Sequence, residues 1–190
     1  SSPRAWWRLR AAGHDAGAVL DGGLPAWRAA GHPIETGPAR PVAAGDIVVT
    51  PADDWIADSA RVCAALDEEA SVVIDARPAA RFEGREPEPR TGLRAGHMPG
   101  ARNLPAGSLI VDGALLPVAA VRKRFDALAS PSAPLVFSCG SGVTAALLAW
   151  AATVAGRSEV AVYDGSWAEW SRFEDYPIDV VSNPTTGNDQ

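Results

Sequence analysis

Short apolar runs alternate along this chain with segments whose apolar residues recur at helical spacing. An uninterrupted apolar run bounded by turn residues is typical of a strand that is buried on both faces. Strands of this kind are predicted at Val72–Ile74, in the run from Pro134 to Cys139, and at Val160–Tyr163. Helices are predicted between and after them, at Pro78–Phe82, at Val118–Leu128, and in the alanine- and leucine-rich segment after Thr144. This alternation predicts an α/β fold with a central, mainly parallel sheet flanked by helices.

The N-terminal part of the chain carries shorter signals. A helix is predicted over Arg4–Ala12, because Gly13 follows it as a usual C-terminal cap residue. Ala18–Leu20 is predicted to form a short strand. Leu24–Trp27 is then predicted to begin a second helix, since Pro25 suits a first helical turn.

Two further segments frame the first buried strand. Thr50 is typical of an N-cap residue and Pro51 of a first helical position, so a helix, in one or two pieces, is predicted from there to about Glu69. The segment Glu83–Pro105 is rich in Gly, Pro and Arg and is predicted to be a long loop. Long loops in compact domains are usually functional or disordered.

Composition and charge narrow the range of partners. The chain has 190 residues, 47% of them hydrophobic, and a net charge of −6, so it offers no basic face for nucleic acid or anionic lipid. No apolar run approaches the roughly 20 residues of a membrane helix. The two cysteines form no disulfide scaffold, and a cytoplasmic protein without nucleic-acid or membrane partners is predicted. No His, Cys or Asp cluster has metal-ligand spacing, so neither a metal nor a cofactor is expected.

A short internal repeat relates the two ends of the chain. Val19–Trp27 matches Val162–Trp170 at an offset of 143, and the same offset aligns Gly13 with Gly156. The repeat predicts that the chain begins with the end of a first domain related to the domain that follows. The position equivalent to Cys139 would lie upstream of the chain. The missing part of the first domain is therefore an expected partner, whether joined to this chain or present as a separate polypeptide.

Four units are predicted on this basis: residues 1–31 as the C-terminal remnant of a first domain, 32–45 as a linker, 46–182 as a complete domain, and 183–190 as a disordered tail. Under the alternative interpretation, Trp6, Trp7 and the helix around them simply pack on the complete domain.

Cys139 is the strongest candidate for chemistry. It lies where a buried strand meets a helix, and the intervening Gly140, Ser141 and Gly142 leave the backbone N–H groups unobstructed. Such N–H groups at a helix N-terminus bind anions, so they would stabilise a thiolate or an anionic persulfide on sulfur. The Ser141 hydroxyl could donate or relay a proton. A structural buried cysteine is the alternative, and it is the interpretation favoured for Cys63 in its helical run.

Two reactions use a cysteine in an anion-binding loop. Cysteine phosphatases need an arginine six positions after the nucleophile, where this chain has Ala145. Sulfur transfer is favoured instead. In that reaction a small anionic donor passes a sulfane sulfur to Cys139, and a thiol or cyanide acceptor removes it.

Several ordered motifs between about Asp46 and Ile178 resemble one known family. They are Cys139-Gly-Ser-Gly-Val-Thr144, Asp75-Ala-Arg77, Arg81-Phe-Glu-Gly84, Glu86-Pro-Glu-Pro-Arg90 and Gly96-His-Met-Pro-Gly100. The set is similar to the tandem rhodanese-type sulfurtransferases, in the form typical of 3-mercaptopyruvate sulfurtransferases. The resemblance implies a catalytic rhodanese-like domain preceded by the end of a non-catalytic one.

The same resemblance assigns roles to residues of the site. It implies Cys139 and Ser141 as catalytic residues, Arg81 and Arg90 as a clamp for the substrate carboxylate or sulfonate, and Gly140, Gly142, Val143 and Thr144 as the substrate-binding loop. Asp75 and Arg77 are expected to pair behind this loop. His97, in a turn, is expected to be structural.

The loop also bears on the sulfur donor. Members of the family that prefer thiosulfate usually have Arg and Lys after the cysteine, whereas this chain has Gly140 and Ser141. The resemblance thus implies 3-mercaptopyruvate as the donor, with thiosulfate weaker. In this family the first domain supplies an acidic side chain to the site, and that part lies outside this chain. A non-catalytic sulfur carrier, and a cysteine phosphatase or arsenate-reductase-like enzyme, are the alternative functions.

Overall fold

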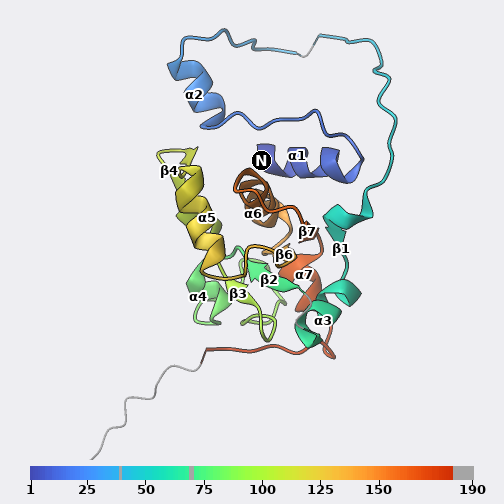
Figure 1. Cartoon of the computed structure of the whole chain (residues 1–190), viewed down its shortest axis with the longest axis vertical. Helices are drawn as coiled ribbons and strands as arrows, with labels where there is room; N and C mark the ends of the chain where they lie inside the picture. Colours follow the sequence, from blue (N-terminus) through green and yellow to red (C-terminus); the bar gives the residue numbers. More distant parts are fainter. Residues whose placement is uncertain (39, 69–70, 182–190) are drawn as a thin grey trace, which may run out of the picture.

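A five-stranded parallel sheet forms the centre of the computed structural model, which describes residues 1–38, 40–68 and 71–181 (Figure 1). Its strand order is β1-β7-β6-β2-β3. The strands are β1 (Ile56–Ala57), β2 (Val72–Asp75), β3 (Arg102–Asn103), β6 (Leu135–Ser138) and β7 (Val160–Tyr163). A separate two-stranded hairpin consists of β4 (Ile110–Val111) and β5 (Ala114–Leu115). The predicted mainly parallel sheet is therefore confirmed.

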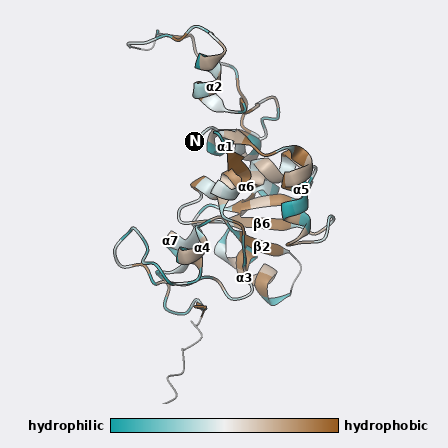
Figure 2. Cartoon of the chain, turned by 90° about the vertical axis from the view of Figure 1, so that its left-hand side faces the viewer, coloured by the Kyte–Doolittle hydropathy of each residue, from teal (hydrophilic) through white to brown (hydrophobic). Residues whose placement is uncertain are grey.

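Helices cover both faces of this sheet. The helices of the described residues are α1 (Ser2–Ala11), α2 (Gly23–Ala29), α3 (Ser59–Asp67), α4 (Ala79–Phe82), α5 (Val118–Asp126), α6 (Val143–Val154) and α7 (Ser166–Trp170), with 3-10 turns at Asp53–Trp55 and Ala106–Leu109. Among them, α2 lies away from the sheet and buries no residue (Figure 1). Figure 2 shows α5 and α6 over one face of the sheet, α3 on the other side, and α1 stacked outside α6. The buried residues of α7 share a core cluster with those of α3. Among the described residues, no helix is both long and apolar enough to cross a membrane.

Alternation along the central strands builds two separate cores. Successive strand residues point to opposite faces. Ile74, Phe137 and Val162 contribute to the core under α5 and α6, whereas Val73, Val136 and Ala161 contribute to the core under α3 and α7. Both faces are buried, which explains why these strands are continuous apolar runs in the sequence.

The sheet topology gathers polar residues at one edge. β2 and β6 pair in parallel, with Asp75 opposite Ser138, so the residue after β6, Cys139, lies beside the end of β2. β7 pairs with the other side of β6 and is followed by Asp164. Ligand sites of open α/β sheets lie at the carboxyl ends of strands, and this edge is the candidate here.

The N-terminal helix is part of the main core. Trp6 and Trp7 of α1 are 5% and 3% exposed and pack in the same cluster as the apolar residues of α6. The Trp7 indole N–H donates to the Trp55 carbonyl oxygen at 2.8 Å, and the Arg4 guanidinium pairs with Asp164 at 2.7 Å. The predicted helix over Arg4–Ala12 is confirmed, beginning two residues earlier.

The strand predicted at residues 18–20 does not form. They lie along the surface and pair with no strand of the described chain. The second predicted helix does form as α2, but all of its residues are at least partly exposed. The repeat therefore recurs in sequence without its strand recurring in structure, because a strand needs a neighbour for its hydrogen bonds.

Of the helix predicted from Thr50 to about Glu69, the start is wrong, whereas the second part forms as α3. The amides of Thr50 and Ala52 donate to the carbonyl oxygens of Ala12 and Ala11, which keeps this segment extended at the end of α1. A single 3-10 turn and β1 follow before α3 begins. The N-cap of α3 is Asp58, whose carboxylate accepts the backbone N–H of Arg61 at 2.8 Å.

The other predicted elements agree closely with the structure. Two short elements, β3 within the predicted long loop and the β4–β5 hairpin after it, were not predicted. Residues 32–38 and 40–45 have no helix or strand. Helix α3 ends at Asp67, close to the predicted end at about Glu69. Glu69 itself and the predicted disordered tail at 183–190 lie outside the described residues.

Because α1 is buried and α2 is exposed, replacing a tryptophan of α1 should destabilise the fold far more than replacing the tryptophan of α2. Trp6→Ala should lower the free energy of unfolding by about 3–5 kcal/mol, because it leaves a cavity between α1 and α6. The matched control is Trp27→Ala on α2, where the side chain is 37% exposed. Urea unfolding followed by circular dichroism gives both values. Equal losses for the two variants would show that α1 contributes no more than the exposed α2.

Candidate active site

Cys139 lies in the wall of a cavity of about 570 Å³ at the carboxyl edge of the sheet. It directly follows β6, and α6 begins at Val143. The four residues between them, Cys139–Gly142, form the active loop. The cavity is lined by Ala76, Arg77, Pro78, Arg81, Glu88, Pro89, Arg90, Leu93, Pro105, Ala106, Gly107, Ser108, Cys139, Gly140, Ser141, Val143 and Thr144. Of the eight residues predicted for the site, seven line this cavity, and Gly142 lies behind it.

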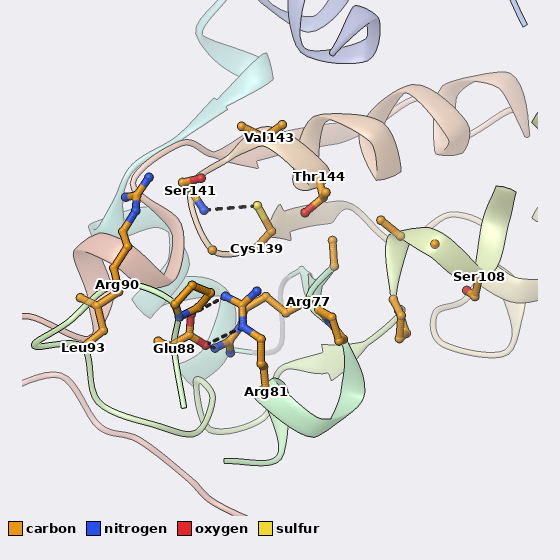
Figure 3. A pocket seen from close by; sticks show the side chains of 17 residues that line it. Arg77, Arg81, Glu88, Arg90, Leu93, Ser108, Cys139, Ser141, Val143 and Thr144 are labelled. Carbon is orange, nitrogen blue, oxygen red and sulfur yellow. Dashed lines mark hydrogen bonds and ion pairs between the residues drawn. The ribbon is translucent and has the colours of Figure 1, made fainter. Parts of the chain in front are cut away.

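The loop backbone directs the N–H group of Ser141 toward the sulfur and two carbonyl groups away from it. The amide of Ser141 donates to Cys139 Sγ at 3.4 Å (Figure 3). The carbonyl oxygens of Cys139 and Gly140 accept the amides of Trp167 and Ala168, at 2.9 and 3.1 Å, on the side of α7. The positive end of one peptide dipole therefore faces Cys139 Sγ, and the negative ends of two others point away from it, which favours an anion on sulfur.

Gly142 makes this loop possible in a way that no other residue could. Its φ is 73°, and a Cβ atom there would lie 2.4 Å from Asp164 Oδ1 and 2.6 Å from the Arg4 guanidinium. Glycine permits both the left-handed conformation and the close approach of this ion pair. The N-terminal helix α1 thus reaches the back of the active loop through Arg4.

A buried ion network forms another wall of the cavity. Arg77 is 1% exposed and pairs with Asp75 at 2.8 Å and with Glu88 at 2.7 Å. Glu88 also pairs with Arg81, so its carboxylate lies between two guanidinium groups (Figure 3). The expected pairing of Asp75 with Arg77 behind the loop is confirmed. Glu88 was missed as a site residue, although its position between two candidate arginines was visible in the sequence.

The arginines leave the cavity with one net positive charge. Arg77, Arg81 and Arg90 line it, and the carboxylates of Asp75 and Glu88 balance two of the three charges. Arg90 has no carboxylate within ion-pair distance among the described residues. Its guanidinium is therefore the cationic group most available to an anionic ligand.

The other residues considered from the sequence differ in whether they line the cavity. Thr144 and Val143, the first residues of α6, line the cavity beside Cys139, and Thr144 faces the sulfur in Figure 3. His97 Nδ1 lies 2.8 Å from the Phe82 carbonyl oxygen, and its ring stacks on Phe82, which agrees with the structural role expected for it. Cys63 lies in α3, away from this cavity, where burial and the Asp67 carboxylate raise the pKa of its thiol.

The sheet order, the loop after β6 and the cavity together define a rhodanese-like domain. The model of the Rhodanese-like domain family matches residues 59–173. The chain therefore belongs to the rhodanese family, and its predicted relationship to that family is confirmed.

Individual relatives place the chain more closely within the family. It is 38% identical over 186 residues to the 3-mercaptopyruvate sulfurtransferase of Escherichia coli, covering 95% of this chain and 64% of that protein. It is 39% identical over 185 residues to the human enzyme of the same name, covering 96% and 61%. The crystal structure of SseA from Escherichia coli superposes with a TM-score of 0.76 at 36% identity, covering 88% of this chain and 62% of that one. The chain thus spans less than two thirds of the length of these relatives.

The ion network around Glu88 predicts a strong dependence on its charge. Glu88→Gln should lower the free energy of unfolding by about 3 kcal/mol, because it leaves the buried Arg77 and the adjacent Arg81 with an uncompensated charge. Glu83→Gln is the control, since Glu83 pairs with the half-exposed Arg85 and should contribute less than about 1 kcal/mol. Chemical denaturation measures both variants. Similar small losses would contradict a buried network.

Proposed function

We propose that this chain is the catalytic part of a sulfurtransferase that carries a sulfane sulfur as a persulfide on Cys139. The observation that carries the proposal is the placement of Cys139 Sγ against the backbone N–H of Ser141, in a cavity that arginine side chains also line. The names of the relatives support the same activity. An anion on sulfur is stabilised by the loop, and an anionic donor by the arginines.

The chemistry proceeds in two balanced steps. The Cys139 thiolate attacks the sulfur of 3-mercaptopyruvate, and the carbon–sulfur bond breaks with its electron pair going to carbon. Protonation of the resulting enolate gives pyruvate, with the Ser141 hydroxyl as the nearby proton donor or relay. An acceptor thiolate or cyanide then attacks the outer sulfur of the persulfide, the sulfur–sulfur bond breaks, and the Cys139 thiolate returns.

The charge of the cavity supports 3-mercaptopyruvate over thiosulfate as the donor. One net positive charge suits one carboxylate, which Arg90 and Arg81 would bind with charge-assisted hydrogen bonds. Gly140 and Ser141 add no cation to the loop that could balance a dianion. Thiosulfate is accordingly the weaker donor in this proposal.

The domain organisation is proposed from the repeat. Residues 1–31 correspond to the end of a first, non-catalytic rhodanese-like domain, 32–45 to a linker, and 46–182 to the catalytic domain. The relatives are longer than this chain, which supports a contribution from further residues to the complete enzyme. A non-catalytic sulfur carrier is the second candidate, because such a protein would need only the persulfide-forming half of the site.

Persulfide formation tests the nucleophile directly. After treatment with 3-mercaptopyruvate, mass spectrometry should find one additional sulfur atom on Cys139 and none on Cys63. Cys139→Ser should abolish the adduct, and Cys63→Ser should retain it, because burial and Asp67 raise the pKa of Cys63 and leave little thiolate there at neutral pH. An adduct that persists in Cys139→Ser would refute the assignment. An adduct without release of sulfur to cyanide would favour the carrier function.

The clamp is tested through the donor concentration that half-saturates persulfide formation. Arg90→Gln should raise this concentration by about tenfold to a hundredfold, which corresponds to the loss of one charge-assisted hydrogen bond. Arg102→Gln is the control, because Arg102 is exposed on β3 and does not line the cavity. If the two variants behave alike, Arg90 does not bind the donor.

A further inference from the structure

Ser166 occupies a strained position directly behind the active loop. It is the first residue of α7, is fully buried, and has a φ of 53°. The left-handed conformation costs most residues other than glycine roughly 1–2 kcal/mol. Among the described residues, only Asp112 is a second non-glycine residue with a positive φ. Strain of this kind persists where the surrounding structure requires the side chain.

The internal repeat provides a comparison at the same backbone position. The offset of 143 aligns Ser166 with Gly23, which is likewise the first residue of its helix and has a φ of 56°. At this one position the first copy has a glycine, which adopts the positive φ without a side chain and without strain, although the preceding Gly22 and Gly165 differ in φ, at 72° and −58°. In the second copy of the repeat, beside Cys139, the strained serine therefore needs a reason that glycine would not supply, and its hydroxyl group is that difference.

That hydroxyl group uses its full hydrogen-bonding capacity. Ser166 Oγ donates to the Tyr163 carbonyl oxygen at 2.8 Å and accepts the amides of Cys139 and Gly142, at 3.2 and 3.0 Å. A hydroxyl has one donor and two acceptor positions, so all three are occupied. Cys139 Sγ lies 4.0 Å from Oγ. The Tyr163 carbonyl oxygen is the closer acceptor of the single hydroxyl proton, so the contact of Oγ with the sulfur is the weaker of the two.

We propose that Ser166 is a positioning residue that sets the conformation of the active loop and thereby directs the Ser141 N–H at the sulfur. It holds the amides at the two ends of the loop, and the amide of Ser141 between them is left to face Cys139 Sγ. The neighbouring amides of Trp167 and Ala168 hold the loop carbonyls from the same side. This role deepens the proposed persulfide chemistry and rests on it for its biological meaning.

The test compares the reactivity of Cys139 with the stability of the fold. Ser166→Ala removes the hydroxyl and keeps the strain, whereas Ser166→Gly removes both, as in the Gly23 copy. Ser171→Ala is the matched control, because Ser171 is also buried next to α7 and its hydroxyl has no hydrogen-bond partner in the described chain. The readouts are the melting temperature, the rate at which iodoacetamide alkylates Cys139 at neutral pH, and the rate of persulfide formation.

Ser166→Gly should melt at or above the temperature of Ser166→Ala, yet both should alkylate Cys139 about tenfold more slowly than the unmodified chain, since a thiolate loses one directed N–H group. Ser171→Ala should react at the unmodified rate. Alkylation of Cys139 in Ser166→Gly at the unmodified rate would overturn the proposal. If Ser166→Ala does not fold, Ser166→Gly alone provides the test. Alkylation needs no sulfur donor, so an unmodified chain that alkylates normally but forms no persulfide refutes the proposed function and leaves the role of Ser166 measurable.

Discussion

The guanidinium group of Arg77 connects the parts of the chain that form the site. It is buried, pairs with Asp75 at the end of β2 and with Glu88 in the long loop, and donates to the Gly96 carbonyl oxygen at 2.9 Å. It also lies 4.4 Å from the centre of the Trp167 ring on α7. A planar group with five donors can satisfy all of these partners at once, which lysine could not. The long loop is thereby fixed against the sheet without any regular structure of its own.

This arrangement separates two kinds of charge stabilisation within one cavity. The backbone N–H of Ser141 faces the sulfur, and it cannot move independently of the fold. Three arginine side chains line the rest of the cavity, and Arg90, in the long loop, has no carboxylate partner among the described residues. A rigid site for the reacting atom and an adaptable one for the substrate anion are consistent with transfer between different partners.

The sequence allowed the central strands and the loop after β6 to be predicted, because both depend on local patterns. Continuous apolar residues mark the strands, and Gly140 and Gly142 mark a bare turn before a helix. The contributions of Thr50 and Ser166 could not be predicted in this way. Thr50 is held extended by carbonyl groups of α1, and Ser166 acts on a loop that precedes it by more than twenty residues. Such contacts exist only after the chain has folded.

The position of α1 separates two divisions of the chain, one drawn from the sequence repeat and one drawn from the packed core. The predicted domain division would place α1 with α2 in the first copy of the repeat, yet the tryptophans of α1 pack in the core under α6, and Arg4 reaches Gly142. A break of the backbone within the linker would leave α1 held in place by its buried surface. The two pieces would then behave as complementing fragments, and the polypeptide could be divided there without dividing the structure that supports the sulfur.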